Sequence, residues 1–134
     1  MQFIAWFKDL SKQDVAIAGG KGANLGEMFN AGLPVPPGFV VTAQTYKHFI
    51  EKTGLKEKIF SLLKKVDINN TEQLQKIAEQ IQQSIKSVSI PEDIAEEIID
   101  AYHSLSLPPK PSAEELMSPK EAFVAVRSSA TAED

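Results

Sequence analysis

The chain has 134 residues, of which 43% are hydrophobic and 24% are charged, a composition typical of a globular domain. Its net charge of −4 argues against a nucleic-acid or membrane-surface role, and the absence of cysteine excludes disulfides, thiolate metal sites and a cysteine nucleophile. The opening lacks a signal-peptide pattern, and no apolar run approaches the ~18 residues of a membrane span, so a single cytoplasmic domain is expected.

Three apolar runs near the start of the chain predict short strands, at residues 3–7, 15–18 and 38–41. Gly19-Gly20 interrupts the second run, and a helix is expected from about Gly22 to Ala31. The apolar residues at helical spacing in it, which predict its buried face, are Leu25, Met28 and Phe29.

The middle of the chain is predicted to be helical. Thr42 stands at the N-cap position of one helix, and Asn70 precedes Gln73 at the spacing of an N-cap and its N3 partner in another. Apolar residues at helical spacing continue from Leu55 to Leu105, which predicts a bundle of amphipathic helices. The fold class is therefore expected to be α+β, a small sheet with a helical lobe at about 55–107.

Lys21 is the first candidate for a binding residue, because it stands between glycines at the predicted start of a helix. The helix dipole disfavours a cation there unless an anion is bound. A phosphate would meet the ammonium together with backbone N–H groups that glycine leaves accessible. The stretch is not a Walker A loop, since Val15 and Gly22 stand where that motif needs a glycine and a hydroxyl residue. The alternative is a solvated lysine in a turn.

Arg127 is the second candidate, the only arginine beside thirteen lysines. It follows an apolar run, residues 122–126, that predicts a final strand, and ligands of α/β sheets gather beyond the carboxyl ends of strands. A guanidinium suits bidentate phosphate binding better than an ammonium does. Ser128 and the small residues after it would let a phosphate approach closely and offer donors. The alternative is a structural ion pair of Arg127 with Glu133 or Asp134.

Two stretches, "GGKGANLGEMFNAGLPVPPGFVVT" and "AVRSSATAED", resemble the N-terminal ATP-binding region of the phosphoenolpyruvate-utilising enzymes. This group contains phosphoenolpyruvate synthase, pyruvate phosphate dikinase and rifampicin phosphotransferase, and the opening "WFKDL" before the GGK motif looks most like the synthases. The resemblance implies a partial ATP-grasp nucleotide-binding domain over residues 1–134. In the family the lysine after the two glycines, here Lys21, and the arginine of the VRSS motif, here Arg127, contact ATP phosphates. Arg127 is accordingly expected to be catalytic, and Ser128 to join both cations in binding ATP.

The resemblance also implies a reaction and further domains. The synthase reaction converts pyruvate, ATP and water to phosphoenolpyruvate, AMP and phosphate through a phosphohistidine on a separate domain. Neither His48 nor His103 lies in the family's Thr-Cys-His context. Three parts are therefore expected outside this chain: the phosphohistidine domain, the pyruvate-binding barrel, and the second ATP-grasp half with the Mg²⁺ ligands. The chain alone would then be an inactive piece of a larger enzyme.

Two other readings stay open from the sequence. The same ATP-binding part occurs in rifampicin-type phosphotransferases and in pyruvate phosphate dikinases, which act on other acceptors. A chain with this fold is also compatible with a non-catalytic, stand-alone regulatory module.

Overall fold

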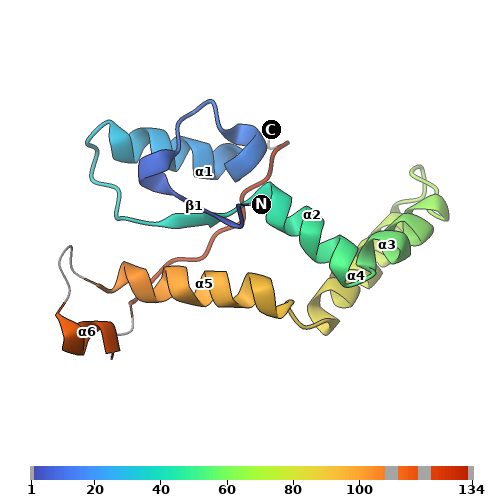
Figure 1. Cartoon of the computed structure of the whole chain (residues 1–134). Helices are drawn as coiled ribbons and strands as arrows, with labels where there is room; N and C mark the ends of the chain where they lie inside the picture. Colours follow the sequence, from blue (N-terminus) through green and yellow to red (C-terminus); the bar gives the residue numbers. More distant parts are fainter. Residues whose placement is uncertain (1, 108–111, 118–121, 133–134) are drawn as a thin grey trace. The chain divides into compact units, whose positions relative to one another are not determined.

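The computed structural model describes residues 2–107, 112–117 and 122–132 (Figure 1). The elements run in the order β1 (Ile4–Trp6), the 3-10 helix η1 (Phe7–Asp9), α1 (Val15–Asn30), β2 (Phe39–Val41), α2 (Ala43–Lys52), α3 (Leu55–Lys64), α4 (Thr71–Ser87), α5 (Glu92–Leu105) and α6 (Ala113–Met117). This mixture of helices with one two-stranded sheet confirms the predicted α+β class. Within the described ranges, no helix is long and apolar enough to cross a membrane.

The chain divides into two compact units. The first combines residues 1–46 with residues 93–134, and the second consists of residues 47–92. The second unit therefore contains α3 and α4, whereas almost all of α5 belongs to the first. The sequence predicts a helical lobe at about 55–107, and the second unit of the structure, at 47–92, overlaps most of that range.

β1 and β2 form an antiparallel sheet in the first unit. The paired residues are Ile4 with Val41, Ala5 with Val40, and Trp6 with Phe39. The rings of the last pair lie 5.3 Å apart between centroids, a distance at which aromatic side chains attract each other. The strands predicted at residues 3–7 and 38–41 are thus confirmed, over Ile4–Trp6 and Phe39–Val41.

The strand predicted at residues 15–18 is wrong, because these residues form the first turn of α1. The N–H groups of Ile17 and Ala18 donate to the carbonyl of Asp14, at 3.1 and 2.9 Å. An apolar run of four residues fits a buried helical turn as well as a buried strand, and only its partners decide between them.

The buried face of α1 consists of small residues: Ala18, Gly19, Gly22, Ala23 and Gly26. A Cβ at Gly22 would stand 2.9 Å from a methyl of Val40, and one at Gly26 would stand 2.5 Å from the Cβ of Leu10. The absence of these side chains lets α1 lie close against β2 and the turn after η1. The larger residues predicted for this face, Leu25, Met28 and Phe29, are only partly buried or exposed.

Two buried threonines join the start of α2 to the residues at the N-terminal end of β1. The Thr42 hydroxyl donates to the Gln2 carbonyl at 2.7 Å, and the Thr45 hydroxyl donates to the Phe3 carbonyl at 2.9 Å. Thr42 Oγ1 also accepts the N–H of Thr45 at 3.3 Å, which confirms its predicted role as an N-cap. Both residues are almost fully buried, so these hydrogen bonds satisfy groups that water does not reach.

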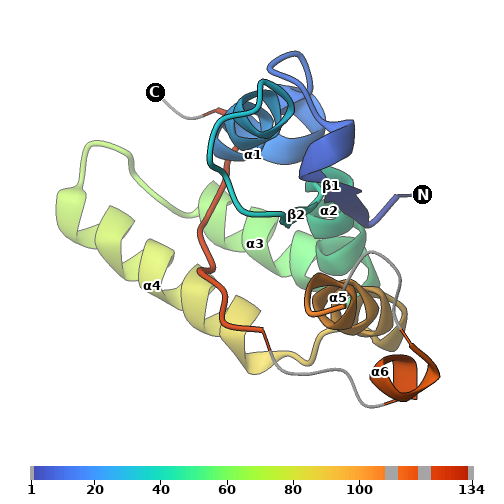
Figure 2. The same cartoon turned by 90° about the vertical axis from the view of Figure 1, so that its left-hand side faces the viewer.

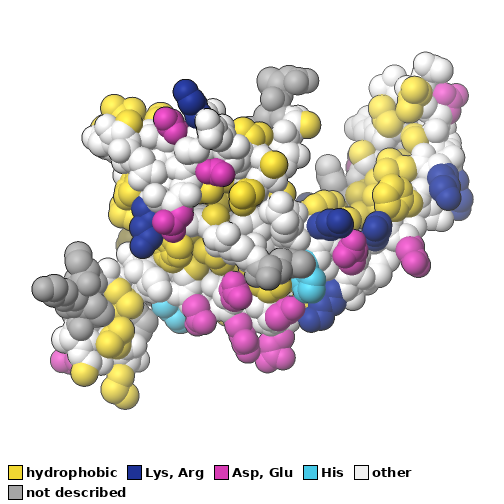
Figure 3. Space-filling model, turned by 45° about the horizontal axis from the view of Figure 1, so that its top comes forward, with side chains coloured by type: hydrophobic (Ala, Val, Ile, Leu, Met, Phe, Trp, Pro, Cys, Tyr) yellow, Lys and Arg dark blue, Asp and Glu magenta, His cyan; other side chains and the backbone are white. Residues whose placement is uncertain are grey.

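α3 and α4 pack against each other in the second unit. Asn70 Oδ1 accepts the N–H of Gln73 at 3.1 Å, so the predicted N-cap of α4 is confirmed. The Gln73 side chain bonds instead to Asp67 and Lys65 of the preceding turn. Large hydrophobic side chains remain exposed on these two helices and the turn between them: Phe60, Leu63, Ile68 and Leu74. Exposed hydrophobic side chains are coloured yellow in Figure 3.

The strand predicted at residues 122–126 is also wrong for the part of the chain that the structure describes. Residues 122–130 run without regular structure from α5 to the start of α1 (Figures 1 and 2). The first residue of this stretch, Ala122, is bound to α5 through the Tyr102 hydroxyl. This hydroxyl donates to the Ala122 carbonyl at 2.8 Å and accepts the Ala122 N–H at 3.1 Å. Phe123 and Val126 are fully exposed. An apolar run forms a strand only where another backbone pairs with it, and the described residues provide none here.

Replacing Thr42 by valine should lower the free energy of unfolding of the first unit by about 1 to 3 kcal/mol, because buried polar groups lose their partners. Denaturation followed by the fluorescence of Trp6, the only tryptophan, measures the change. Thr131→Val is the matched control, since Thr131 is exposed, and its effect should stay within about 0.5 kcal/mol. Equal stability of the two variants would contradict this role of Thr42.

Candidate functional site

The helix that carries Lys21 is interrupted at Gly19. Its backbone has φ 73° and ψ 171°, a conformation that is essentially restricted to glycine, whereas the residues on both sides are helical. The Gly19-Gly20 break predicted from the sequence is therefore present, with a helical turn before it instead of a strand. Lys21 lies in the first turn of the helix that follows the break.

Residues near the end of the chain bind at this interruption. Ser129 Oγ accepts the N–H of Gly22 at 3.0 Å and donates to the carbonyl of Ala18 at 2.7 Å. The N–H of Gly20 donates to the carbonyl of Ala130 at 2.9 Å. These three hydrogen bonds, called the Ser129 clamp below, join segments that are more than 100 residues apart in sequence.

Gly19 also makes room for the Ser129 clamp. A Cβ at this position would overlap Ser129 Oγ and would stand 2.9 Å from the backbone nitrogen of Ala130. Any side chain here would therefore push the two segments apart. The absence of a side chain at Gly19 is required both by its backbone conformation and by the close approach of the second segment.

Lys21 reaches the segment that contains Arg127. Its ammonium donates to the carbonyl of Ser128 at 2.9 Å, across 107 residues of sequence. The structure thus brings Lys21 and the backbone of Ser128 together, and Arg127 is the residue before Ser128. Arg127 is exposed, and within the described residues its guanidinium has no hydrogen bond or ion pair. Glu133 and Asp134, its predicted alternative partners, lie outside the described residues.

The backbone N–H groups of Gly20 and Gly22 do not face an anion, which corrects one expectation from the sequence. Both groups donate to the Ser129 clamp. The hydroxyl of Ser129 occupies the position that an N-cap oxygen takes at a helix start. The candidate groups to meet a phosphate are then the side chains of Lys21, Arg127 and Ser128, and all three residues are exposed.

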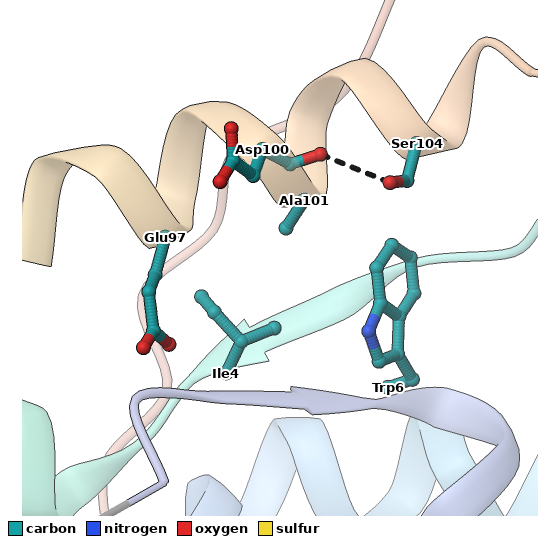
Figure 4. Close-up of a pocket in the computed structure, with 6 residues that line it drawn as sticks. All are labelled: Ile4, Trp6, Glu97, Asp100, Ala101 and Ser104. Atoms are coloured by element: carbon teal, nitrogen blue, oxygen red, sulfur yellow. Dashed lines mark hydrogen bonds between the residues drawn. The ribbon is translucent and has the colours of Figure 1, made fainter. Parts of the chain in front are cut away.

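A hollow of about 260 Å³ lies between β1 and α5 (Figure 4), away from these residues. It is lined by Ile4, Trp6, Glu97, Asp100, Ala101 and Ser104. Two carboxylates would repel a polyphosphate at this place. The hollow is therefore a poor candidate for the phosphates of a nucleotide.

The described residues contain no group of three or more His, Asp or Glu side chains that could hold a metal ion. His48 lies on α2 and His103 lies on α5. The Mg²⁺ ligands expected outside this chain remain a prediction.

Comparison with known proteins supports the resemblance. Residues 15–134 match the family described as "Pyruvate phosphate dikinase, AMP/ATP-binding domain". The whole chain is 52% identical to the "Probable phosphoenolpyruvate synthase" of Methanocaldococcus jannaschii, and it covers 11% of that protein's length. It is 41% identical to the "Phosphoenolpyruvate synthase" proteins of Pyrococcus furiosus and Helicobacter pylori, with 99% and 100% of the chain aligned. The chain spans only 19% and 16% of these two relatives.

Replacing Gly19 by alanine should destabilise the first unit and open the Ser129 clamp. Gly32→Ala is the matched control, because Gly32 also has a positive φ, of 83°, but nothing lies within 4 Å of a Cβ built on it. Gly32→Ala should cost about 1 to 2 kcal/mol for the backbone alone. Gly19→Ala should cost at least about 1 kcal/mol more, because of the overlap with Ser129.

The two variants are compared by denaturation and by amide hydrogen exchange at Gly22. Faster exchange at Gly22 in Gly19→Ala, but not in Gly32→Ala, is the expected result. Equal stability and equal exchange in both variants would mean that glycine is needed at position 19 only for its positive φ, and not for the close approach of Ser129.

Proposed function

The chain belongs to the family of the pyruvate phosphate dikinase AMP/ATP-binding domain, and we propose that it binds ATP as part of a phosphoenolpyruvate synthase. The relatives that cover the whole chain at 41 to 52% identity are named as such synthases. The proposed reaction turns pyruvate, ATP and water into phosphoenolpyruvate, AMP and phosphate. A histidine on another domain would carry the phosphoryl group, and pyruvate would bind in a further domain.

One observation supports this proposal most strongly, the 2.9 Å hydrogen bond between Lys21 Nζ and the carbonyl of Ser128. It holds an ammonium beside the residue that follows the only arginine, in a chain with a net charge of −4. An ammonium and a guanidinium on adjacent segments are the groups that bind a polyphosphate in proteins.

The two cations fit different parts of a polyphosphate. The guanidinium of Arg127 is a planar fork that can bind two oxygens at once, whereas the ammonium of Lys21 acts as a compact point charge. In the proposed site, Arg127 stabilises the charge that develops during phosphoryl transfer, and Lys21 and Ser128 hold the phosphates. ATP supplies the phosphoryl group when it is bound.

The rest of the site is proposed to lie outside this chain. In this proposal the chain is the first half of an ATP-grasp domain, and the second half contributes Mg²⁺ ligands. The acidic hollow beside Trp6 has the wrong charge to complete the phosphate site. The cytoplasmic location stays a prediction from the sequence.

Lys21→Ala and Arg127→Ala should each lower ATP-dependent autophosphorylation of the complete enzyme by about 100-fold or more, because each removes a charge that stabilises the transition state. Transfer from labelled ATP measures the rate, and circular dichroism checks that the fold survives. Lys8→Ala is the matched control, an exposed lysine on η1 that should leave the rate unchanged. Near-wild-type rates in both site variants would refute the assignment.

The 134-residue chain alone should hydrolyse no ATP and should bind it only weakly, because the proposed site is completed by other domains. Calorimetric titration with Mg-ATP measures the affinity. A dissociation constant in the micromolar range would mean that this chain holds a complete nucleotide site, and would contradict the division of the site between two halves.

A further inference from the structure

We propose that Ser129 is a positioning residue whose hydroxyl fixes the place of Lys21 relative to Arg127. The proposal rests on the ATP site described above and adds to it a residue that acts without touching the nucleotide. Three observations support it. The Ser129 hydroxyl makes two hydrogen bonds, the Gly20 N–H donates to the carbonyl of the neighbouring Ala130, and the Lys21 ammonium donates to the Ser128 carbonyl.

The Ser129 hydroxyl spans the interruption in α1. It donates to Ala18, the last residue before Gly19, and accepts from Gly22, which lies beyond Lys21. The backbone of Lys21 is thus held between Gly20 and Gly22, both of which donate to the last segment. A shift of Ser129 would move the helix start, and with it the base of the Lys21 side chain.

The same residue fixes the other cation. Ser129 lies two positions after Arg127, so the backbone that carries the guanidinium is anchored where the hydroxyl is bonded. The Lys21 ammonium also donates to the Ser128 carbonyl, so the end of the lysine side chain is attached to the segment that carries Arg127. One hydroxyl group therefore sets the relative position of two residues that are 106 positions apart in the sequence.

Ser129 itself is poorly suited to bind a phosphate. A serine hydroxyl has a single proton, and that proton is donated to the Ala18 carbonyl at 2.7 Å. A phosphate accepts hydrogen bonds and therefore requires a donor. Its neighbour Ser128 has an exposed side chain with no hydrogen bond to other described residues, so the two serines of the motif have different roles.

A double-mutant cycle between Ser129→Ala and Lys21→Ala tests the proposal in the complete enzyme. Ser129→Ala should lower kcat/KM for ATP about 10-fold or more, since a misplacement of about 1 Å costs up to about 100-fold. Ser129→Thr keeps the hydroxyl and should restore most of the rate. In the Lys21→Ala background, measured with labelled ATP, the loss on removing Ser129 should be smaller than in the wild type, because only the position of Arg127 then still depends on the hydroxyl.

The control is Ser104→Ala, an exposed serine whose hydroxyl bonds only within its own helix, and it should behave as the wild type. Equal losses from Ser129→Ala in both backgrounds would show a purely structural role and overturn the proposal, as would no loss in either. If Ser129→Ala does not fold, Ser129→Cys replaces it, because a thiol fills the place but is a weak donor.

Hydrogen exchange on the 134-residue chain separates this inference from the proposed function. Exchange at Gly22 should be faster in Ser129→Ala than in the wild type and normal in Ser129→Thr; unchanged exchange would overturn the clamp itself. Failure of the wild-type enzyme to be phosphorylated by ATP would overturn the proposed function, whatever the exchange data show. An active wild type with a fully active Ser129→Ala variant would overturn the positioning role alone.

Discussion

A single serine hydroxyl connects the two segments on which the candidate site depends. Ser129 bonds to Ala18 and Gly22, on either side of the break at Gly19, and so takes the position of an N-cap for the helix that follows the break. Without it, the N–H of Gly22 and the carbonyl of Ala18 would lose their partners, and the lysine motif would not be held against the arginine motif. The placement of Lys21 beside Ser128 follows from this connection.

The glycines of the first motif allow close packing of backbone against backbone and side chain. Gly22 and Gly26 let α1 approach Val40 and Leu10 closely, and Gly19 admits the hydroxyl of Ser129. Glycine-rich stretches that precede a helix are commonly associated with phosphate binding through backbone N–H groups. Here two of those groups bind the chain itself, so a bound phosphate would depend on side chains, and chiefly on the two cations.

Features with a local cause could be predicted from the sequence. The N-caps at Thr42 and Asn70 act on residues three positions away, and the strands at β1 and β2 have β-forming residues. Both wrong strands, at residues 15–18 and 122–126, are apolar runs whose structure depends on a partner elsewhere. The role of Ser129 gives no local signal, because its partners lie more than 100 residues away. Lys21 and Arg127 stood out because charge and residue type are readable without a structure.

The account is tested most directly by a crystal structure of the complete enzyme with Mg²⁺ and a non-hydrolysable ATP analogue. It predicts that the ammonium of Lys21 and the guanidinium of Arg127 both contact the triphosphate, while Ser129 stays bonded to Ala18 and Gly22. A nucleotide whose phosphates lie elsewhere, out of reach of both cations, would contradict it.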